Sequence, residues 1–113
     1  MSRDSRLYLD DIFESCNKVS RYIEGLDQSE VMQNELIVDA ILRNLMVIGE
    51  AAKKLPNEWK QRYGDIEWRK IAGLRDVIAH EYFQLDEEIL WDVVSNKLPE
   101  LENVVSRMLD ELA

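Results

Sequence analysis

The sequence predicts an all-α protein, an up-down bundle of four main helices with one short extra helix. Apolar residues recur at spacings of three and four along most of the chain, which is the period of helices that bury one side. Only four Gly and two Pro interrupt the 113 residues, and no segment reads as a strand. A chain of this length is expected to form one domain that covers residues 1–113.

The first helix is expected from about Asp4 to Glu24. Its apolar residues follow one helical face: Leu9, Ile12, Cys16, Val19, Ile23 and Leu26. Gly25 and Asp27 should end this helix, and Asp27 with Glu30 has the spacing of a capping box for the next one.

The second helix is expected from about Ser29 to Leu55 as the central helix of the bundle. It carries two neighbouring apolar seams, so it should pack against more than one neighbour. These seams consist of Ile37, Ile41, Asn44, Ile48, Ala51 and Leu55, and of Val38, Leu42, Leu45, Gly49 and Ala52. A glycine inside a helix costs about 1 kcal/mol relative to alanine, so Gly49 favours a close approach of another helix.

A short helix should follow Pro56, over Glu58 to Tyr63, and Gly64 should close it. Asp65 is then expected to cap a third main helix that runs to about His80.

The last helix should begin after Asp86 and continue to the end of the chain with the same spacing of apolar residues. Pro99 lies inside it and should kink or split it, because proline cannot donate a backbone hydrogen bond.

Charge limits the functions that this chain can have. A formal net charge of -9 argues against broad adhesion to nucleic acid or to anionic membranes, so any RNA contact should be a local cationic spot. No apolar run is long enough to span a bilayer and the first residues do not resemble a signal peptide, so a cytoplasmic location is expected. Cys16 has no cysteine partner and should pack as a small apolar residue.

One segment near the end of the third main helix combines several reactive groups. Arg75 is a permanent cation, His80 titrates near neutral pH, and Tyr82 is a phenol. At about 100° per residue, Asp76 and His80 should project together on the side away from the core, where the carboxylate can orient the imidazole. Taken singly, each group has a structural interpretation: a histidine at a helix C-terminus, an arginine with a solvated head, and an aromatic at the edge of the bundle.

This segment resembles the signature of the HEPN superfamily, and within it the HepT-like ribonuclease toxins. The family motif Arg-x4-His-x-Tyr is matched by Arg75, His80 and Tyr82. Two further stretches match as well, residues 43–51 (Arg-Asn-Leu-Met-Val-Ile-Gly-Glu-Ala) and 68–75 (Trp-Arg-Lys-Ile-Ala-Gly-Leu-Arg). The chain departs from the family at Asp76, where many relatives have Asn, which makes the local field more negative.

The resemblance implies a HEPN-like fold and a metal-independent endoribonuclease that is the toxin of a toxin–antitoxin pair. It also implies a partner, a minimal nucleotidyltransferase of the MNT type, that acts as antitoxin by transferring AMP to the motif tyrosine. By position that tyrosine is Tyr82. Neither a metal nor a cofactor is expected.

We expect RNA cleavage by attack of the ribose 2′-hydroxyl on the adjacent phosphate. His80 would exchange protons, Arg75 would hold the non-bridging oxygens, and Asp76 would orient His80. The reaction uses both a base and an acid, yet the chain has one histidine. A homodimer with the motif helices at its interface would supply two.

A function of a different class is also compatible with the sequence. The chain could be a non-catalytic module that binds a minimal nucleotidyltransferase and recruits its substrate, since the acidic surface suits a protein partner equally well. A ferritin-type metal site is disfavoured because the only histidine has Val77 three residues before it, where such sites have Glu. No glycine-rich loop with a lysine supports NTP hydrolysis. The tryptophans, Trp59, Trp68 and Trp91, are expected to be packing anchors rather than base-stacking platforms.

Overall fold

The computed structural model describes residues 4–81 and 86–112, with side chains described outside residues 75–85. Every regular element within these ranges is helical, which confirms the predicted all-α class. The elements are α1 (Ser5–Ile23), α2 (Gln28–Met32), α3 (Glu35–Lys53), α4 (Asn57–Arg62), α5 (Trp68–Glu81), α6 (Glu87–Asp92), the π-helical turn η2 (Val93–Lys97) and α7 (Leu98–Glu111).

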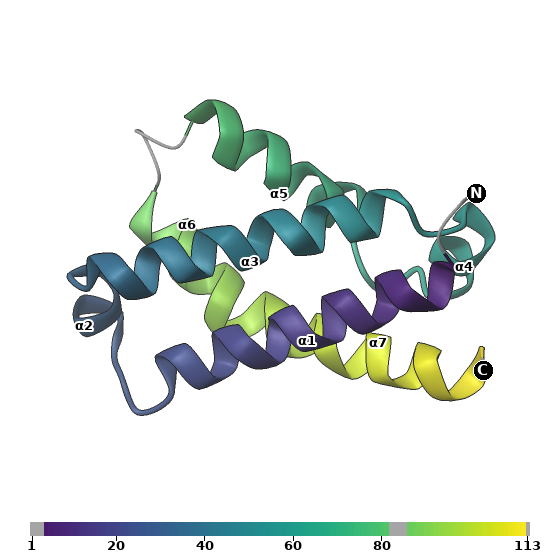
Figure 1. The fold of residues 1–113 in the computed structure, drawn as a ribbon, viewed down its shortest axis with the longest axis horizontal. Helices are drawn as coiled ribbons and strands as arrows, with labels where there is room; N and C mark the ends of the chain where they lie inside the picture. The colour runs from purple at the N-terminus through teal and green to yellow at the C-terminus, as the bar shows by residue number, and fades with distance from the viewer. Residues whose placement is uncertain (1–3, 82–85, 113) are drawn as a thin grey trace.

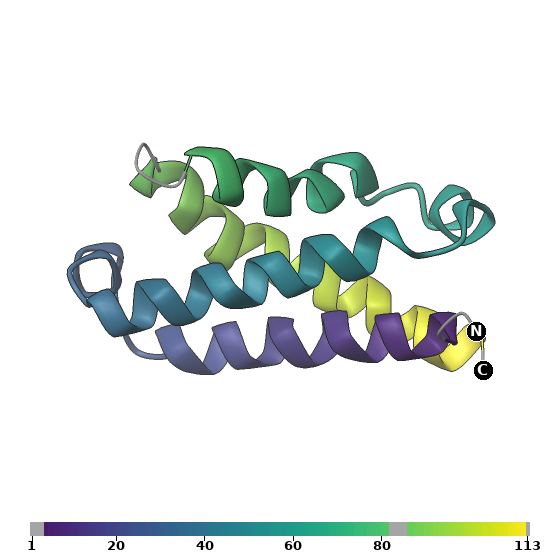
Figure 2. The same cartoon turned by 45° about the horizontal axis from the view of Figure 1, so that its top comes forward.

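The four long helical units run alternately up and down the bundle. Figures 1 and 2 show α3 between α1 and α5, with the continuous unit of α6, η2 and α7 crossing one side of these three helices. The start of α1 and the end of α7 lie at the same end of the molecule (Figure 1). The central position predicted for the second long helix is therefore confirmed.

The first helix has the predicted extent. The side chain of Asp4 accepts a hydrogen bond from the backbone N–H of Arg6 at 2.9 Å, which caps the start of α1. Beyond the last turn, Gly25 has a φ of 76°, a left-handed conformation that side chains other than glycine rarely adopt. The chain can thus turn sharply between α1 and α2.

The second predicted helix is in fact two helices. The capping box is confirmed, since Asp27 accepts from the backbone of Glu30 at 2.9 Å and Glu30 accepts from the backbone of Asp27 at 3.0 Å, but it starts only the short α2. Asn34 then caps α3, because its side chain accepts from the backbone N–H of Ile37 at 3.1 Å. A side chain that bonds the backbone in this way competes with helix continuation, which accounts for the break.

The short helix after Pro56 is confirmed as α4, but the prediction that Asp65 caps the next helix is wrong. Asp65 lies in a turn, and α5 begins only at Trp68. The buried indole N–H of Trp68 donates to the backbone oxygen of Tyr63 at 3.0 Å, and Ile66 is buried beside it. Burial of these two side chains holds residues 63–67 in a compact turn, so the helix starts later.

The C-terminal unit is split, as Pro99 predicts. Asp86 accepts backbone hydrogen bonds from Glu88 and Ile89 and caps α6 as expected. The π-helical turn η2 precedes α7, and Pro99 occupies the first turn of α7, where its missing N–H costs little.

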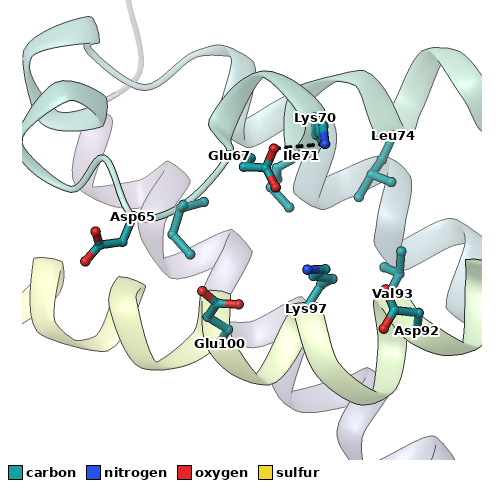
Figure 3. A pocket seen from close by; sticks show the side chains of 10 residues that line it. Asp65, Glu67, Lys70, Ile71, Leu74, Asp92, Val93, Lys97 and Glu100 are labelled. Atoms are coloured by element: carbon teal, nitrogen blue, oxygen red, sulfur yellow. Dashed lines mark ion pairs between the residues drawn. The ribbon is translucent and has the colours of Figure 1, made fainter.

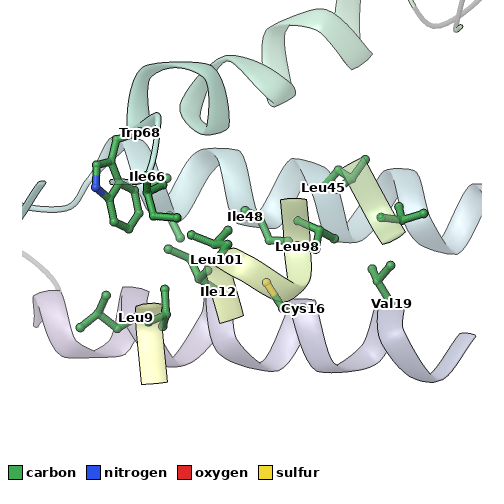
Figure 4. Packing of buried hydrophobic residues seen from close by; sticks show 14 of the residues in the cluster. Leu9, Ile12, Cys16, Val19, Leu45, Ile48, Ile66, Trp68, Leu98 and Leu101 are labelled. Atoms are coloured by element: carbon green, nitrogen blue, oxygen red, sulfur yellow. The ribbon is translucent and has the colours of Figure 1, made fainter. Parts of the chain in front are cut away.

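The core lies where α1, α3 and α7 meet. Figure 4 shows Leu9, Ile12, Cys16 and Val19 of α1 pointing toward Leu45 and Ile48 of α3, with Leu98 and Leu101 of α7 between them. Cys16 packs as the small apolar residue that was predicted, and its burial raises the pKa of its thiol to about 12.

The tryptophans serve the core as predicted. Trp68 is buried, and Trp59 and Trp91 are half-buried against the same cluster. Within the described ranges, no helix combines the length and the apolar content that crossing a lipid bilayer would require.

Candidate active site on helix α5

Helix α5 carries three of the four residues that the sequence singles out, Arg75, Asp76 and His80. Positions 76 and 80 are one helical turn apart, so their backbones lie on the same side of the helix. The side chains of these three residues lie outside the described part of the chain, and Tyr82 lies outside the described residues altogether. The contact expected between Asp76 and His80, and the meeting of Arg75 with His80, therefore stay predictions.

The register of α5 indicates which side of the helix bears the motif positions. Leu74, immediately before the motif, lines a groove between α5 and the α6–η2–α7 unit. At about 100° per residue, position 76 lies about 200° and position 80 about 240° around the helix axis from Leu74. Positions 76 and 80 are thus on the side of α5 turned away from that groove.

The start of α5 is tied to the far end of α7. The hydroxyl of Tyr63, just before α5, donates to a carboxylate oxygen of Glu111 at 2.7 Å. This hydrogen bond, and then burial of the ring, raises the pKa of Tyr63 above its ordinary value. The guanidinium groups of Arg62 and Arg107 lie 5.5 and 5.8 Å from the ring centroid. The first turn of the motif helix is consequently held by contacts from two ends of the chain.

The groove beside α5 has a volume of about 270 Å³ and an apolar floor (Figure 3). One wall comes from α5 and the turn before it, and the other from the α6–η2–α7 unit. Its lining residues are Asp65, Ile66, Glu67, Lys70, Ile71, Leu74, Asp92, Val93, Lys97 and Glu100. Lys70 forms an ion pair with Glu67 at 2.9 Å. The hydrogen bond from Lys70, and more weakly the charge of Lys97, lower the pKa of Glu67.

The charges of this groove do not favour an RNA backbone. Its two cations, Lys70 and Lys97, face four carboxylates among the lining residues given above, and Lys70 is already paired. Phosphate oxygens would meet a net negative surface there. Sequence analysis did not identify this groove, because its walls come from segments about 30 residues apart and only the Glu67–Lys70 spacing gave a local signal.

Helix α3 contains the second stretch that matches the family. Asn44 is buried there, and its side-chain amide donates to the backbone oxygen of Ala40 at 2.8 Å. Gly49 is buried as well. Arg43 is exposed and Glu50 is half-exposed, with a 3.5 Å ion pair from Glu50 to Lys54. Asn44 and Gly49 thus serve packing, whereas Arg43 and Glu50 face the surface.

Metal coordination has no support in the described part of the chain. Among the residues that the structure describes, no group of three or more His, Cys, Asp or Glu side chains is arranged to hold a metal ion.

Comparisons with known proteins identify the family. The family model described as "Ribonuclease HepT-like" matches residues 12–108. A protein of Caldanaerobacter subterraneus subsp. tengcongensis named as a putative RNase is 33% identical over 106 residues, which cover 94% of this chain and 95% of that relative. A protein of Thermococcus cleftensis named as a probable ribonuclease HepT is 31% identical over 108 residues, which cover 96% of this chain and 98% of that relative.

A longer relative also matches. A protein of Methanocaldococcus jannaschii, named as a gamma-glutamylcyclotransferase and putative RNase, is 31% identical over 112 residues. The match covers 99% of this chain, which spans about half the length of that relative (50%). No solved structure was found to match the chain. With nearly the whole sequence matched by the family model and by these relatives, the chain belongs to the HepT-like ribonuclease family.

Proposed function

We propose that this chain is a metal-independent endoribonuclease and the toxin of a toxin–antitoxin pair. Membership of the HepT-like ribonuclease family identifies it as an RNA endonuclease. The observation that carries the finer proposal is the position of the family motif, because Arg75, Asp76 and His80 all belong to the single helix α5. The family match over residues 12–108 includes this helix.

The proposed chemistry needs no metal. The ribose 2′-hydroxyl attacks the neighbouring phosphorus after His80 takes its proton, and the 5′-oxygen of the next nucleotide leaves with a proton. Arg75 holds the non-bridging oxygens, on which negative charge increases in the transition state. Asp76, one turn before His80, orients the imidazole.

A homodimer would complete this site. A single histidine must otherwise serve both as base and as acid, whereas two chains bring two His80 and two Arg75 to one cleft. The paired motifs also concentrate cations on a chain whose net charge of -9 is unfavourable for RNA.

RNA cleavage in the presence of EDTA tests the proposal. The wild-type chain is expected to cleave single-stranded RNA with EDTA present. His80→Ala should slow cleavage by about 100- to 10,000-fold, since it removes the acid–base group. Arg75→Ala should slow it by about 100- to 1,000-fold, since it removes charge stabilisation in the transition state.

The matched control is Arg69→Ala, which removes an exposed arginine from the same helix outside the motif. Its cleavage rate should equal that of wild type, and circular dichroism should show unchanged helicity in all three variants. Equal rates for wild type and His80→Ala would contradict the proposal and would favour a non-catalytic module that binds a nucleotidyltransferase.

The antitoxin part of the proposal has its own measurement. An MNT-type nucleotidyltransferase would transfer AMP from ATP to the hydroxyl of Tyr82, adding bulk and negative charge two residues from His80 and repelling RNA. Intact mass after incubation with that enzyme and ATP should increase by one or more AMP groups in wild type. An unchanged adduct on Tyr82→Phe would count against Tyr82 as the acceptor.

A further inference from the structure

The exposed side of α3 carries a stripe of six residues whose spacing is the same in both directions. We call this set the front stripe: Asp39, Arg43, Met46, Val47, Glu50 and Lys54. Its spacings of 4, 3, 1, 3 and 4 place all six within about 100° of the helix circumference. None of the six is buried, and Met46 retains 38% of its surface. The front stripe faces away from the core, which α3 contacts through Ile41, Leu45 and Ile48.

The charges of the front stripe are complementary to the same stripe read backwards. If two copies of α3 lie antiparallel about a two-fold axis between positions 46 and 47, Arg43 faces Glu50 of the second copy and Asp39 faces Lys54. Met46 and Val47 meet at the centre. Each charged position thus meets the opposite charge, and the apolar pair lies on the axis, as a self-complementary dimer interface requires.

We propose that the front stripe is the surface on which a second copy of this chain packs. This inference deepens the homodimer part of the proposed function, on which it rests, by naming the helix and the register of the contact.

The neighbourhood of the stripe suits such a partner. Between α1 and α3 lies a groove of about 480 Å³ that includes Tyr8 and Asp11 of α1 and most of the front stripe. Side chains from a facing α3 can enter this concave surface. The amine of Lys54 lies 5.6 Å from the ring centroid of Tyr8 and 3.5 Å from Glu50. The Lys54–Glu50 pair is about half exposed (49% and 44%), so exchanging it for contacts to a second copy costs little.

The register of α5 relates this interface to the motif. Figures 1 and 2 show α5 directly beside α3. Positions 76 and 80 lie on the side of α5 away from the α6–η2–α7 unit, and the front stripe lies on the corresponding side of α3. Pairing through α3 would therefore bring both copies of the motif helix to the flanks of one interface.

Charge reversal tests the register directly. Arg43→Glu places two carboxylates together, the new one at position 43 and that of Glu50 in the second copy. Glu50→Arg likewise places two guanidinium groups together, so each single change should weaken the dimer at least about tenfold. The double variant R43E/E50R should restore it. An equal mixture of the two single variants should form a mixed dimer, in which each like-charged pair is replaced by one pair of opposite charge on either side of the axis.

Molar mass from light scattering or sedimentation at several concentrations reports the result. Asp110→Arg serves as control, since Asp110 is exposed on α7 away from the front stripe, and its dimer should match wild type. A wild-type chain that is monomeric at all concentrations overturns the inference. A dimer that both single variants leave unchanged overturns it as well.

Thiol cross-linking gives an independent measure of the register. Met46→Cys puts the two new thiols beside the axis, so a short bifunctional reagent should join two chains. Leu36→Cys, on the same helix and 83% exposed, puts them about 30 Å apart along the axis, beyond the reach of that reagent. Cys16 is buried in both variants and should not react.

Cross-linking at position 36 but not at position 46 would overturn the antiparallel register. These readouts need no RNA, so a dimer without cleavage would contradict the proposed enzyme alone, and cleavage by a monomer would contradict the inference alone.

Discussion

The two sides of α3 differ in what they contribute to the protein. Toward the core it presents Ile41, Leu45, Ile48 and Ala52, each no more than 2% exposed. On the opposite side, the front stripe combines four charged residues with Met46 and Val47.

The core side follows from the general requirements of a helical bundle. Any set of apolar residues of suitable size at spacings of three and four would let α3 pack against α1 and α7. The front stripe is different, because folding does not require its charges to occur in one order. An order that pairs with itself in reverse is explained by assembly, so we locate the intermolecular contacts on the front of α3 and stability on its back.

Thiol reactivity should separate the two sides most strongly. Cys16 packs against the back of α3, and burial raises its thiol pKa to about 12, so a thiol reagent should reach it only through unfolding. The cysteine in Leu36→Cys should react at the rate of a free thiol, at least about 1,000-fold faster at pH 8. Ellman's reagent measures both rates. Comparable rates would mean that the back of α3 is open to solvent.

The same substitution on each side should have very different effects on stability. Leu45→Ala removes a side chain that is 2% exposed and should lower the free energy of unfolding by about 2–5 kcal/mol. Leu36→Ala, at 83% exposure on the same helix, should change it by no more than about 0.5 kcal/mol. Urea unfolding monitored by circular dichroism measures both, and similar losses would remove the distinction between the two sides.

A smaller and pH-dependent effect is expected where the back of the bundle is joined to the motif helix. The pKa of Tyr63 is raised, mainly by its hydrogen bond to Glu111, so the folded state holds the phenol proton more tightly than the unfolded state. This contribution to stability is complete below the ordinary pKa of 10.0 and is lost as the pH rises through the higher folded value. Tyr63→Phe should therefore be less stable than wild type at pH 7, and the difference should shrink above about pH 10. Thermal unfolding at a series of pH values tests this, and a constant difference up to about pH 11 would contradict it.

Much of the fold could be predicted because helix period and capping are local properties. The spacing of apolar residues indicated the extent of α1, and Asp86 and Pro99 marked the start and the division of the C-terminal unit. The errors arose where a local signal has two outcomes. Asn34 lies within a helical pattern yet caps a helix, and Asp65 resembles a cap yet lies in a turn that the burial of Trp68 determines.

The candidate site was predictable in part for the same reason. Arg75, Asp76 and His80 are close in sequence, so their shared place on α5 follows from helix formation alone. The groove with Lys70 and Lys97 was not predictable, because it depends on how α5 and η2 pack across the bundle. The reverse complementarity of the front stripe is present in the sequence, but it has meaning only once burial shows that this side of α3 is exposed.

The most direct test of the account is cleavage of an RNA whose reacting 2′-hydroxyl has been removed. After the cleavage position is mapped, an oligonucleotide with a single 2′-deoxy substitution there is incubated with the wild-type chain in EDTA. The account predicts that this substrate stays intact at that position, while the all-ribose control gives a product ending in a 2′,3′-cyclic phosphate, detected by mass spectrometry. Equal cleavage of the two substrates would contradict the proposed attack by the 2′-hydroxyl and the roles given to His80 and Arg75.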